Sequence, residues 1–201
     1  GRADLVVRRT LLFHNGRELQ RPLLFALLLG WLSQVTGRPG YLDGRHANQH
    51  AFAALKQDGT ITAWGIDDYG GAGAPVGAGY TDIFSTNGAF AALGPDGSIR
   101  AWGHDKWGGS GAPLDAGYVT IYSTAYAFAA LKIDGSLTAW GSGWGGGAGA
   151  PNDSGYIRLA SMYHAFAALK ADGSITAWGS SWGSSGAPTD KGYTAIASTA
   201  Y

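Results

Sequence analysis

The sequence of 201 residues contains no cysteine, one methionine and one glutamate. Without cysteine the chain can form no disulfide, no thiolate metal site and no cysteine nucleophile. Charged residues make up 14% of the chain and the formal net charge is zero, which excludes binding to nucleic acid or to an anionic membrane driven by bulk charge. The strongly apolar run at 23–32 has ten residues, too few to span a bilayer.

The chain is instead rich in glycine and tryptophan, with 34 and 8 residues, and its apolar content of 45% is that of a folded protein rather than of a disordered one. Every acid after Glu18 is an aspartate, which favours turns, so we expect the acids to serve turns. The neutrality is a cancellation, because residues 1–50 carry a net charge of +4 and residues 51–201 carry −4.

The second part of the chain is a tandem repeat. The string AFAAL begins at Ala51 and returns at Ala89, Ala127 and Ala165, which gives copies at 51–88, 89–126, 127–164 and 165–201. The period is 38 residues, and the last copy lacks one residue in the loop after Trp178. A sustained period of this length is typical of propellers and solenoids, in which each unit buries its apolar surface against its neighbours.

Each copy predicts three strands and no helix. The AFAAL run leads to an Asp-Gly pair and then to an alternating run such as 174–178, which together indicate a β-hairpin with a tight turn. A Gly-rich loop ends in Gly-Ala-Pro, and a Gly-Tyr pair then opens a third run rich in β-branched and aromatic residues, such as 118–124. Asp-Gly hairpins are antiparallel, which favours a β-propeller over a parallel β-solenoid. We therefore expect an all-β fold, a partial propeller of about four three-stranded antiparallel blades, over residues 40–201.

The motif AFAALKADGSITAWG at 165–179, followed by a Gly-rich loop, a proline and Gly-Tyr, resembles the repeats of the regulator-of-chromosome-condensation superfamily. Within that superfamily the pattern is most similar to the type II β-lactamase inhibitory proteins. The resemblance covers about 40–201 and implies a propeller of short blades, whose rings have about seven blades where this chain has four copies. An open arc of four blades would expose an apolar blade face at each end. We therefore expect the four copies either to be part of a longer array of repeats or to belong to a homo-oligomer that completes the ring.

Residues 1–39 form a basic and apolar segment with two interpretations. The run at 23–32, preceded by Arg17 and Arg21, has the size of the apolar part of a secretory signal, so the segment could be a targeting remnant. Alternatively it caps the exposed face of the first blade, because repeat arrays need covered ends.

Catalytic and metal-binding patterns are sparse. None of the five histidines recurs in every copy, and His46 and His50 would share a face only on a helix. The pair Asp67-Asp68 beside two glycines faintly suggests a calcium loop, but later copies do not keep it. The Gly-rich loops lack the Gly-Lys-Ser/Thr of a phosphate site. We therefore expect no enzyme, no cofactor and no metal.

Aromatic residues carry the strongest functional pattern. The tryptophans of the Ala-Trp-Gly strands recur in all copies, as do the Gly-Tyr tyrosines, and both indicate packing between blades. A further class lies in the Gly/Ser-rich loops, four or five residues after each strand tryptophan: Tyr69, Trp107, Trp144 and Trp182. These rings either fold back on their own blades or form a row of exposed rings along one rim, suited to binding because they bury large areas at little conformational cost.

The positions just before each AFAAL vary while the rest of the repeat is constant, and variation on a constant scaffold is typical of recognition. The candidate binding residues there are His50, Asn87, Tyr126, Tyr163, His164 and Tyr201. The resemblance implies that the matching connection carries aromatic residues that grip a target enzyme, which places that role on Tyr126, Tyr163 and Tyr201, whereas His50 and Asn87 depart from the pattern.

These observations predict a non-catalytic binding module that presents loop aromatics to a protein partner, at an extracellular or cell-surface location. Two alternatives remain: a module that binds polysaccharide or adheres to surfaces through the loop tryptophans, and an architectural array whose copies assemble end to end.

Overall fold

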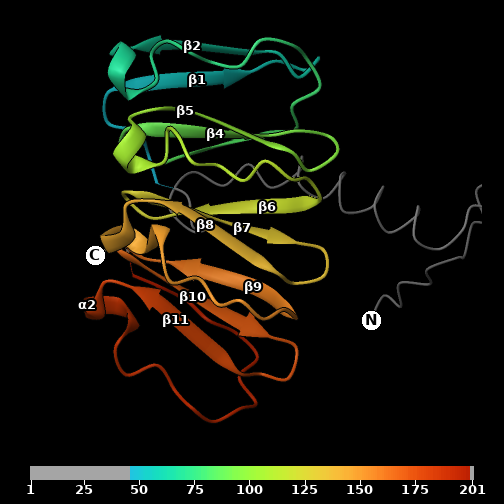
Figure 1. Cartoon of the computed structure of the whole chain (residues 1–201), viewed down its shortest axis with the longest axis vertical. Coiled ribbons are helices and arrows are strands. Elements are labelled where there is room, and N and C mark those ends of the chain that lie inside the picture. The colour runs from blue at the N-terminus through green and yellow to red at the C-terminus, as the bar shows by residue number, and fades with distance from the viewer. Residues whose placement is uncertain (1–45, 200–201) are drawn as a thin grey trace, which may run out of the picture. The chain divides into compact units, whose positions relative to one another are not determined.

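The computed structural model describes residues 46–199, so the segment 1–39, the residues 40–45, and residues 200–201 with the candidate Tyr201 lie outside the described part of the chain. Each copy forms the expected hairpin, in which the AFAAL strand pairs antiparallel with the Ala-Trp-Gly strand (Figure 1). The hairpins are β1 (Ala51–Leu55) with β2 (Ile61–Gly65), β4 (Ala89–Leu93) with β5 (Ile99–Gly103), β7 (Ala127–Lys132) with β8 (Leu137–Gly141), and β10 (Ala165–Lys170) with β11 (Ile175–Gly179).

The Asp-Gly turns form for the expected reason. In the third copy Gly135 has φ +79°, and the Asp134 carboxylate accepts the backbone N–H of Ser136 at 2.9 Å. That backbone hydrogen bond, followed by one from the Ser136 hydroxyl, lowers the pKa of Asp134. Glycine is also required by space, because a Cβ at Gly135 would lie 2.5 Å from the backbone nitrogen of Tyr156. The prediction that the repeated aspartates serve turns is confirmed here.

The Gly-Tyr runs supply the third strands, but to the sheet of the following copy. These strands are β3 (Asp82–Ser85), β6 (Tyr118–Ser123) and β9 (Tyr156–Ser161). They give sheets in the order β3-β4-β5, β6-β7-β8 and β9-β10-β11, beside the two-stranded sheet β1-β2. All pairings are antiparallel, which confirms the propeller prediction and contradicts a parallel solenoid. Each blade therefore begins at a Gly-Tyr run, out of phase with the copies that begin at AFAAL.

Two details differ from the prediction. The last Gly-Tyr run, 193–198, is not a strand, and no strand among residues 46–199 pairs with it. The loops after the hairpins also contain short helices, where no helix was expected: η1 (Asp67–Tyr69), η2 (Asp105–Trp107), η3 (Gly143–Gly147) and α2 (Ser181–Ser184). A glycine with φ near +98° ends each of the first two, so each helix stops after one turn.

The core lies between successive blades. One face of each blade presents a stacked Phe–Trp pair, such as Phe128 and Trp140, with ring centroids 5.1 Å apart. The pair packs on the alanine and leucine side chains of the preceding blade, including Ala91 and Leu93. The Trp140 indole N–H donates to the carbonyl of Gly108 in the preceding loop at 3.0 Å, and the same bond recurs at Trp102 and Trp178. The strand tryptophans of these three blades are thus buried core residues, as the repeat pattern indicates.

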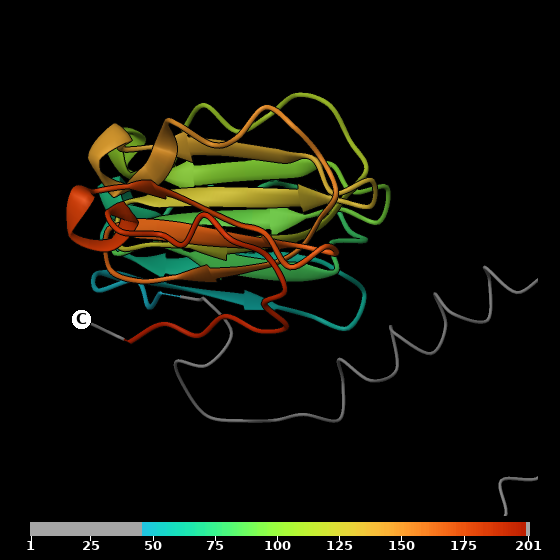
Figure 2. The same ribbon diagram turned by 90° about the horizontal axis from the view of Figure 1, so that it is seen from below.

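The blades follow one another in a row from β1-β2 to β9-β10-β11, and the short helices gather at one end of the strands (Figures 1 and 2). Within residues 46–199 no helix has the length and apolar character that crossing a membrane requires.

Candidate functional site

The four loop aromatics lie on the short helices, at the end of the blades opposite the Asp-Gly turns (Figure 2). Tyr69 and Trp107 close η1 and η2 and are half-buried. Trp144 in η3 is 53% exposed and Trp182 in α2 is 81% exposed. The two expected alternatives for these rings are therefore both realised, since the first two rings are packed down and the last two are open to solvent.

A side chain three residues before AFAAL holds each of the first three short helices. The Thr124 hydroxyl accepts the backbone N–H of Ala127 at 3.0 Å and donates to the carbonyl of Gly145 at 2.8 Å. In the second copy the Thr86 hydroxyl likewise accepts the backbone N–H of Ala89 and donates to the Trp107 carbonyl. In the first copy the amide of Asn48 makes both bonds, accepting the backbone N–H of Ala51 and donating to the Tyr69 carbonyl. The fourth copy has Met162 here, which can make no such bonds.

The variable residues before AFAAL lie beside the loop rings. His50 contacts Tyr69, with ring centroids 4.2 Å apart. Tyr126 lies between two loop rings, 5.3 Å from Trp107 and 6.1 Å from Trp144. His164 lies 3.7 Å from Trp144 and 6.3 Å from Trp182. The two sets of predicted binding residues, separate in the sequence, therefore meet in one surface.

We call this surface the aromatic track, and it is made of His50, Tyr69, Trp107, Tyr126, Trp144, His164 and Trp182. A residue before AFAAL alternates with a loop aromatic along it. In the second copy the slot before AFAAL holds Gly88, and here Tyr69 and Trp107 contact each other directly with centroids 5.5 Å apart. A Cβ at Gly88 would lie 2.6 Å from Tyr69 Cδ1 and 2.4 Å from Trp107 Cε3, so the absence of a side chain keeps the track continuous.

Asn87 and Tyr163 lie one position earlier and form the polar border of the track. The Asn87 amide donates to the Tyr163 hydroxyl at 3.3 Å, and the Tyr163 and Tyr126 hydroxyls are 3.4 Å apart. Backbone bonds tie this position together across blades, since Gln49 N–H donates to the Asn87 carbonyl and Asn87 N–H to the Ala125 carbonyl. Asn87 itself is buried, so its role is to hold Tyr163 rather than to meet a ligand.

Burial and hydrogen bonding shift three titratable groups near the track. The hydrogen bond with Tyr163 raises the pKa of Tyr126, and burial adds to the effect. Burial lowers the pKa of His164. Burial also lowers the pKa of His46, with a smaller contribution from the charge of His164. Both imidazoles are thereby held in their neutral form near neutral pH.

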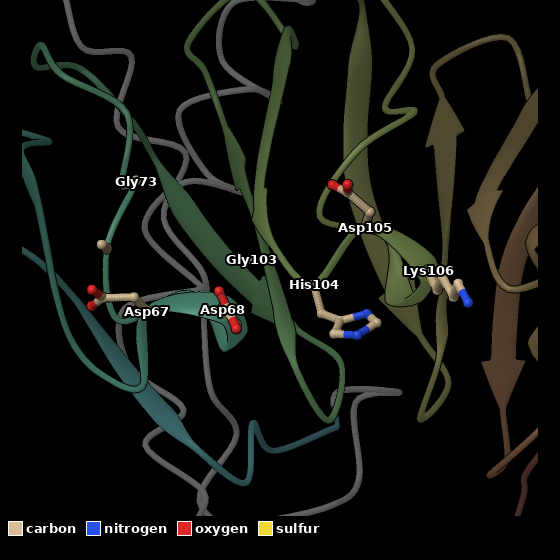
Figure 3. Close-up of a pocket in the computed structure, with 8 residues that line it drawn as sticks. Asp67, Asp68, Gly73, Gly103, His104, Asp105 and Lys106 are labelled. Carbon is tan, nitrogen blue, oxygen red and sulfur yellow. The ribbon is translucent and has the colours of Figure 1, made fainter.

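The candidate cation residues do not converge. His46 contacts Tyr163 and His50 contacts Tyr69, so the two histidines point to different partners. Asp67 and Asp68 line a surface groove opposite His104, Asp105 and Lys106 of the next blade (Figure 3). Among residues 46–199 no three histidine, aspartate or glutamate side chains come together to hold a metal ion.

Sequence reasoning missed four residues that contribute to the site. His104 stacks on Trp107 with centroids 4.6 Å apart and extends the track sideways. Gly88 sets the distance between the Tyr69 and Trp107 rings. Thr86 and Thr124 hold the short helices that carry Trp107 and Trp144. The recurrence of threonine three residues before AFAAL, at 86 and 124, was a readable signal for the last role.

Comparison with known proteins supports the fold. No protein-family model and no curated protein matches the sequence. The ectodomain of the receptor kinase CR4 from Physcomitrella patens aligns with 77% of this chain and 44% of its own, at 20% identity and a TM-score of 0.57. The CRINKLY WD40 ectodomain of the receptor kinase ACR4 from Arabidopsis thaliana aligns with 75% of this chain and 54% of its own, at 18% identity and a TM-score of 0.54. The structure of Prp20p from Saccharomyces cerevisiae aligns with 64% of this chain and 41% of its own, at 19% identity and a TM-score of 0.47.

The chain thus spans about half the length of the structures that it matches. The expected resemblance is confirmed at the level of the fold, a repeat β-propeller similar to those of the two receptor-kinase ectodomains. The narrower likeness to the β-lactamase inhibitory proteins stays a prediction.

Proposed function

We propose that the chain is a non-catalytic binding module whose aromatic track receives a protein partner. The observation that carries the proposal is the continuity of the track over four blades, with its last two tryptophans exposed on a rigid scaffold. Tryptophan and tyrosine supply most of the energy of protein interfaces, because large rigid rings lose little conformational freedom on binding. Trp144 and Trp182 are therefore the expected energetic centre, with Tyr126 and Tyr163 contributing hydroxyl groups at the border.

The ring orientations favour a protein over a polysaccharide. Trp144 and Trp182 meet at 75°, and Trp144 and His164 meet at 61°. A sugar chain stacks best on flat ring faces that share one plane, whereas side chains of a protein partner can enter the angled spaces between rings. Polysaccharide binding remains the alternative, which the same variants test.

The decisive experiment replaces both exposed rings, Trp144→Ala with Trp182→Ala, and leaves the packed rings in place. A matched control is Ile133→Ala, because Ile133 is as exposed as Trp182 but lies in a hairpin turn at the opposite end of the strands. Partners captured by the wild-type chain from its source are identified, purified and titrated by calorimetry, and immobilised polysaccharides are tested in parallel.

We expect the double variant to keep its fold and to lose at least about tenfold in affinity for the protein partner, while the control binds as the wild type does. Loss of binding to a polysaccharide alone would support the alternative. A change in oligomer size without a change in either affinity would support the architectural array, and unchanged binding of every kind would refute a role for the track.

A further inference from the structure

A group of polar side chains lies along the border of the aromatic track. We call it the donor cluster, and it consists of His46, Asn87, Tyr126, Tyr163 and His164. The Tyr163 ring is its centre, with centroid distances of 5.6 Å to His46, 5.8 Å to Tyr126 and 4.4 Å to His164. Residues from four separate segments of the sequence therefore meet around one phenol.

The hydrogen bonds within the donor cluster leave one phenol O–H unused. The Asn87 amide nitrogen, which can only donate, donates to the Tyr163 hydroxyl at 3.3 Å. The Tyr163 and Tyr126 oxygens are 3.4 Å apart, so one of their two hydrogens lies between them. Two phenols carry two such hydrogens, and the second is therefore free to donate out of the pair. Residues 46–199 supply no acceptor for it.

His164 contributes a second polar group without a partner. Its side chain is almost fully buried, at 9% exposure, and its Nε2 atom has no hydrogen-bond partner among residues 46–199. Most buried polar atoms in proteins are hydrogen-bonded, so an unpartnered one beside a binding surface points to a group supplied from outside. The His164 ring is 5.4 Å from the Tyr126 ring, so a ligand atom that reached the free phenol O–H would also lie near this imidazole.

The charges around the donor cluster favour an anion. The adjoining loops 142–147 and 180–186 contain no acidic or basic residue. The titratable groups of the cluster are its two phenols and two imidazoles, and no carboxylate, lysine or arginine among residues 46–199 pairs with either imidazole. Burial lowers the pKa of His46, and the charge of a protonated His164 lowers it further. An anion beside both rings would offset this repulsion, whereas a cation would add to it.

We propose that the donor cluster binds a carboxylate from an aspartate or glutamate side chain of the partner. The free phenol O–H donates to one carboxylate oxygen, and the imidazoles of His46 and His164 supply N–H donors beside it. Such bonds are strong because the acceptor is charged. A side chain is favoured over a chain terminus because the track continues on both sides of the cluster, to Trp107 and to Trp182. This inference rests on the proposed function, since it names the group by which the partner is recognised.

The test uses three short peptides whose dissociation constants from the full chain are measured by NMR titration. The first is acetyl-Phe-Gly-Glu-Gly-Phe-amide, called the Glu peptide. The Gln peptide replaces its glutamate by glutamine, which has the same shape without the charge, and the third peptide is the Gln peptide with a free C-terminal carboxylate. The phenylalanines give every peptide rings that can pack on the track. The preference for the Glu peptide over the Gln peptide is the quantity of interest, because a general weakening of the surface leaves it unchanged.

At about pH 6 we expect the wild-type chain to bind the Glu peptide at least about fivefold more tightly than the Gln peptide. Either tyrosine alone would still offer a free O–H, so the decisive variant combines Tyr126→Phe with Tyr163→Phe, which should reduce the preference to less than about twofold. Tyr193→Phe is the matched control, because its hydroxyl donates to Asp190 at the opposite end of the blades, and it should leave the preference unchanged.

Several results would overturn the inference. These are equal affinities of the wild-type chain for the Glu and Gln peptides, a preference that survives in the double tyrosine variant, and no detectable binding of the Glu peptide at millimolar concentrations. Tighter binding of the peptide with the free C-terminus than of the Glu peptide would assign the cluster to a chain terminus and overturn the assignment to a side chain.

The pH dependence of binding tests the imidazoles. A glutamate side chain stays ionised from about pH 8 to about pH 6, whereas imidazoles take up protons over this range. A bound carboxylate favours the protonated imidazole, so the Glu peptide should bind more tightly as the pH falls, and the Gln peptide should not. The increase should be smaller in His164→Phe. An affinity for the Glu peptide that does not change with pH would overturn the role of the imidazoles.

The same peptides separate this inference from the proposed function. Equal binding of the Glu and Gln peptides that is lost in Trp144→Ala with Trp182→Ala would refute the carboxylate site and leave the track as a binding surface. If the double tryptophan variant bound every peptide as the wild type does, the role of the track itself would be refuted.

Discussion

The spacing of the aromatic track at Gly88 gives a prediction that can be worked from the structure. In Gly88→Ala the new Cβ would lie 2.6 Å from Tyr69 Cδ1 and 2.4 Å from Trp107 Cε3, whereas ordinary van der Waals contact begins near 3.4 Å. The Tyr69 ring must therefore retreat by about 0.8 Å and the Trp107 ring by about 1.0 Å. Neither ring is free of other contacts, since His50 contacts Tyr69, and His104 and Tyr126 contact Trp107.

Overpacking of this kind costs about 1–3 kcal/mol of stability. The cost is measured by equilibrium unfolding in urea, where it should lower the midpoint by roughly 0.5–1.5 M for an m-value of about 2 kcal/mol/M. The origin of the cost is tested in a Trp107→Ala background, where the Tyr69 ring can move into the vacated space and Gly88→Ala should cost less than half as much. An equal cost in both backgrounds would show that the strain is in the backbone and would refute the assignment of Gly88 to ring spacing.

Three further predictions concern contacts within and between the blades. Trp140→Phe should cost about 2–4 kcal/mol in urea unfolding, because it leaves the buried Gly108 carbonyl without its donor and opens a cavity. Trp64→Phe, in the exposed Phe52–Trp64 pair, is the matched control and should cost less than about 0.5 kcal/mol. Thr124→Val should cost about 1–3 kcal/mol by the same assay, and Thr124→Ser, which keeps the hydroxyl, should recover most of it; equal losses would refute the hydrogen-bonding role of Thr124. Burial lowers the pKa of His164 in the folded chain, so the unfolded chain binds a proton more readily as the pH falls. The free energy of unfolding should therefore be highest above about pH 6.5 and should fall as the pH drops toward 5. The fall should be smaller in His164→Phe, and an unchanged pH dependence in that variant would contradict the prediction.

The sequence predicted those parts of the fold that local chemistry decides. Asp134 and Gly135 specify their turn through a side-chain hydrogen bond and a positive φ, both properties of two adjacent residues. The burial of Trp140 follows from its recurrence. The grouping of strands into sheets was less accessible, because a Gly-Tyr run is equally close in sequence to the hairpins on both sides. Only packing shows that it joins the hairpin that follows.

The short helices escaped prediction for a different reason. Four of the six residues of the loop 142–147 are glycine, which has low helix propensity, so no local signal there indicates a helical turn. The turn is fixed from outside, by the hydroxyl of Thr124, 21 residues away from the Gly145 carbonyl that it binds. In the fourth copy Met162 supplies no such bond, and there α2 presents Trp182 as the most exposed ring of the track.

The continuity of the track depends on the slot before each AFAAL, a position that varies while the AFAAL strand after it stays constant. The slot lies between successive loop rings, outside the Phe–Trp core that joins the blades. An imidazole, a hydrogen atom or a phenol in the slot therefore changes the distance and angle between rings without changing how blades pack. Gly88 brings two rings into direct contact, Tyr126 separates two rings and adds a hydroxyl, and His164 lies 3.7 Å from Trp144 and holds it at 61°. Exchanging these residues among copies should therefore alter which ligand binds before it alters stability, except where a Cβ enters the space now left by Gly88.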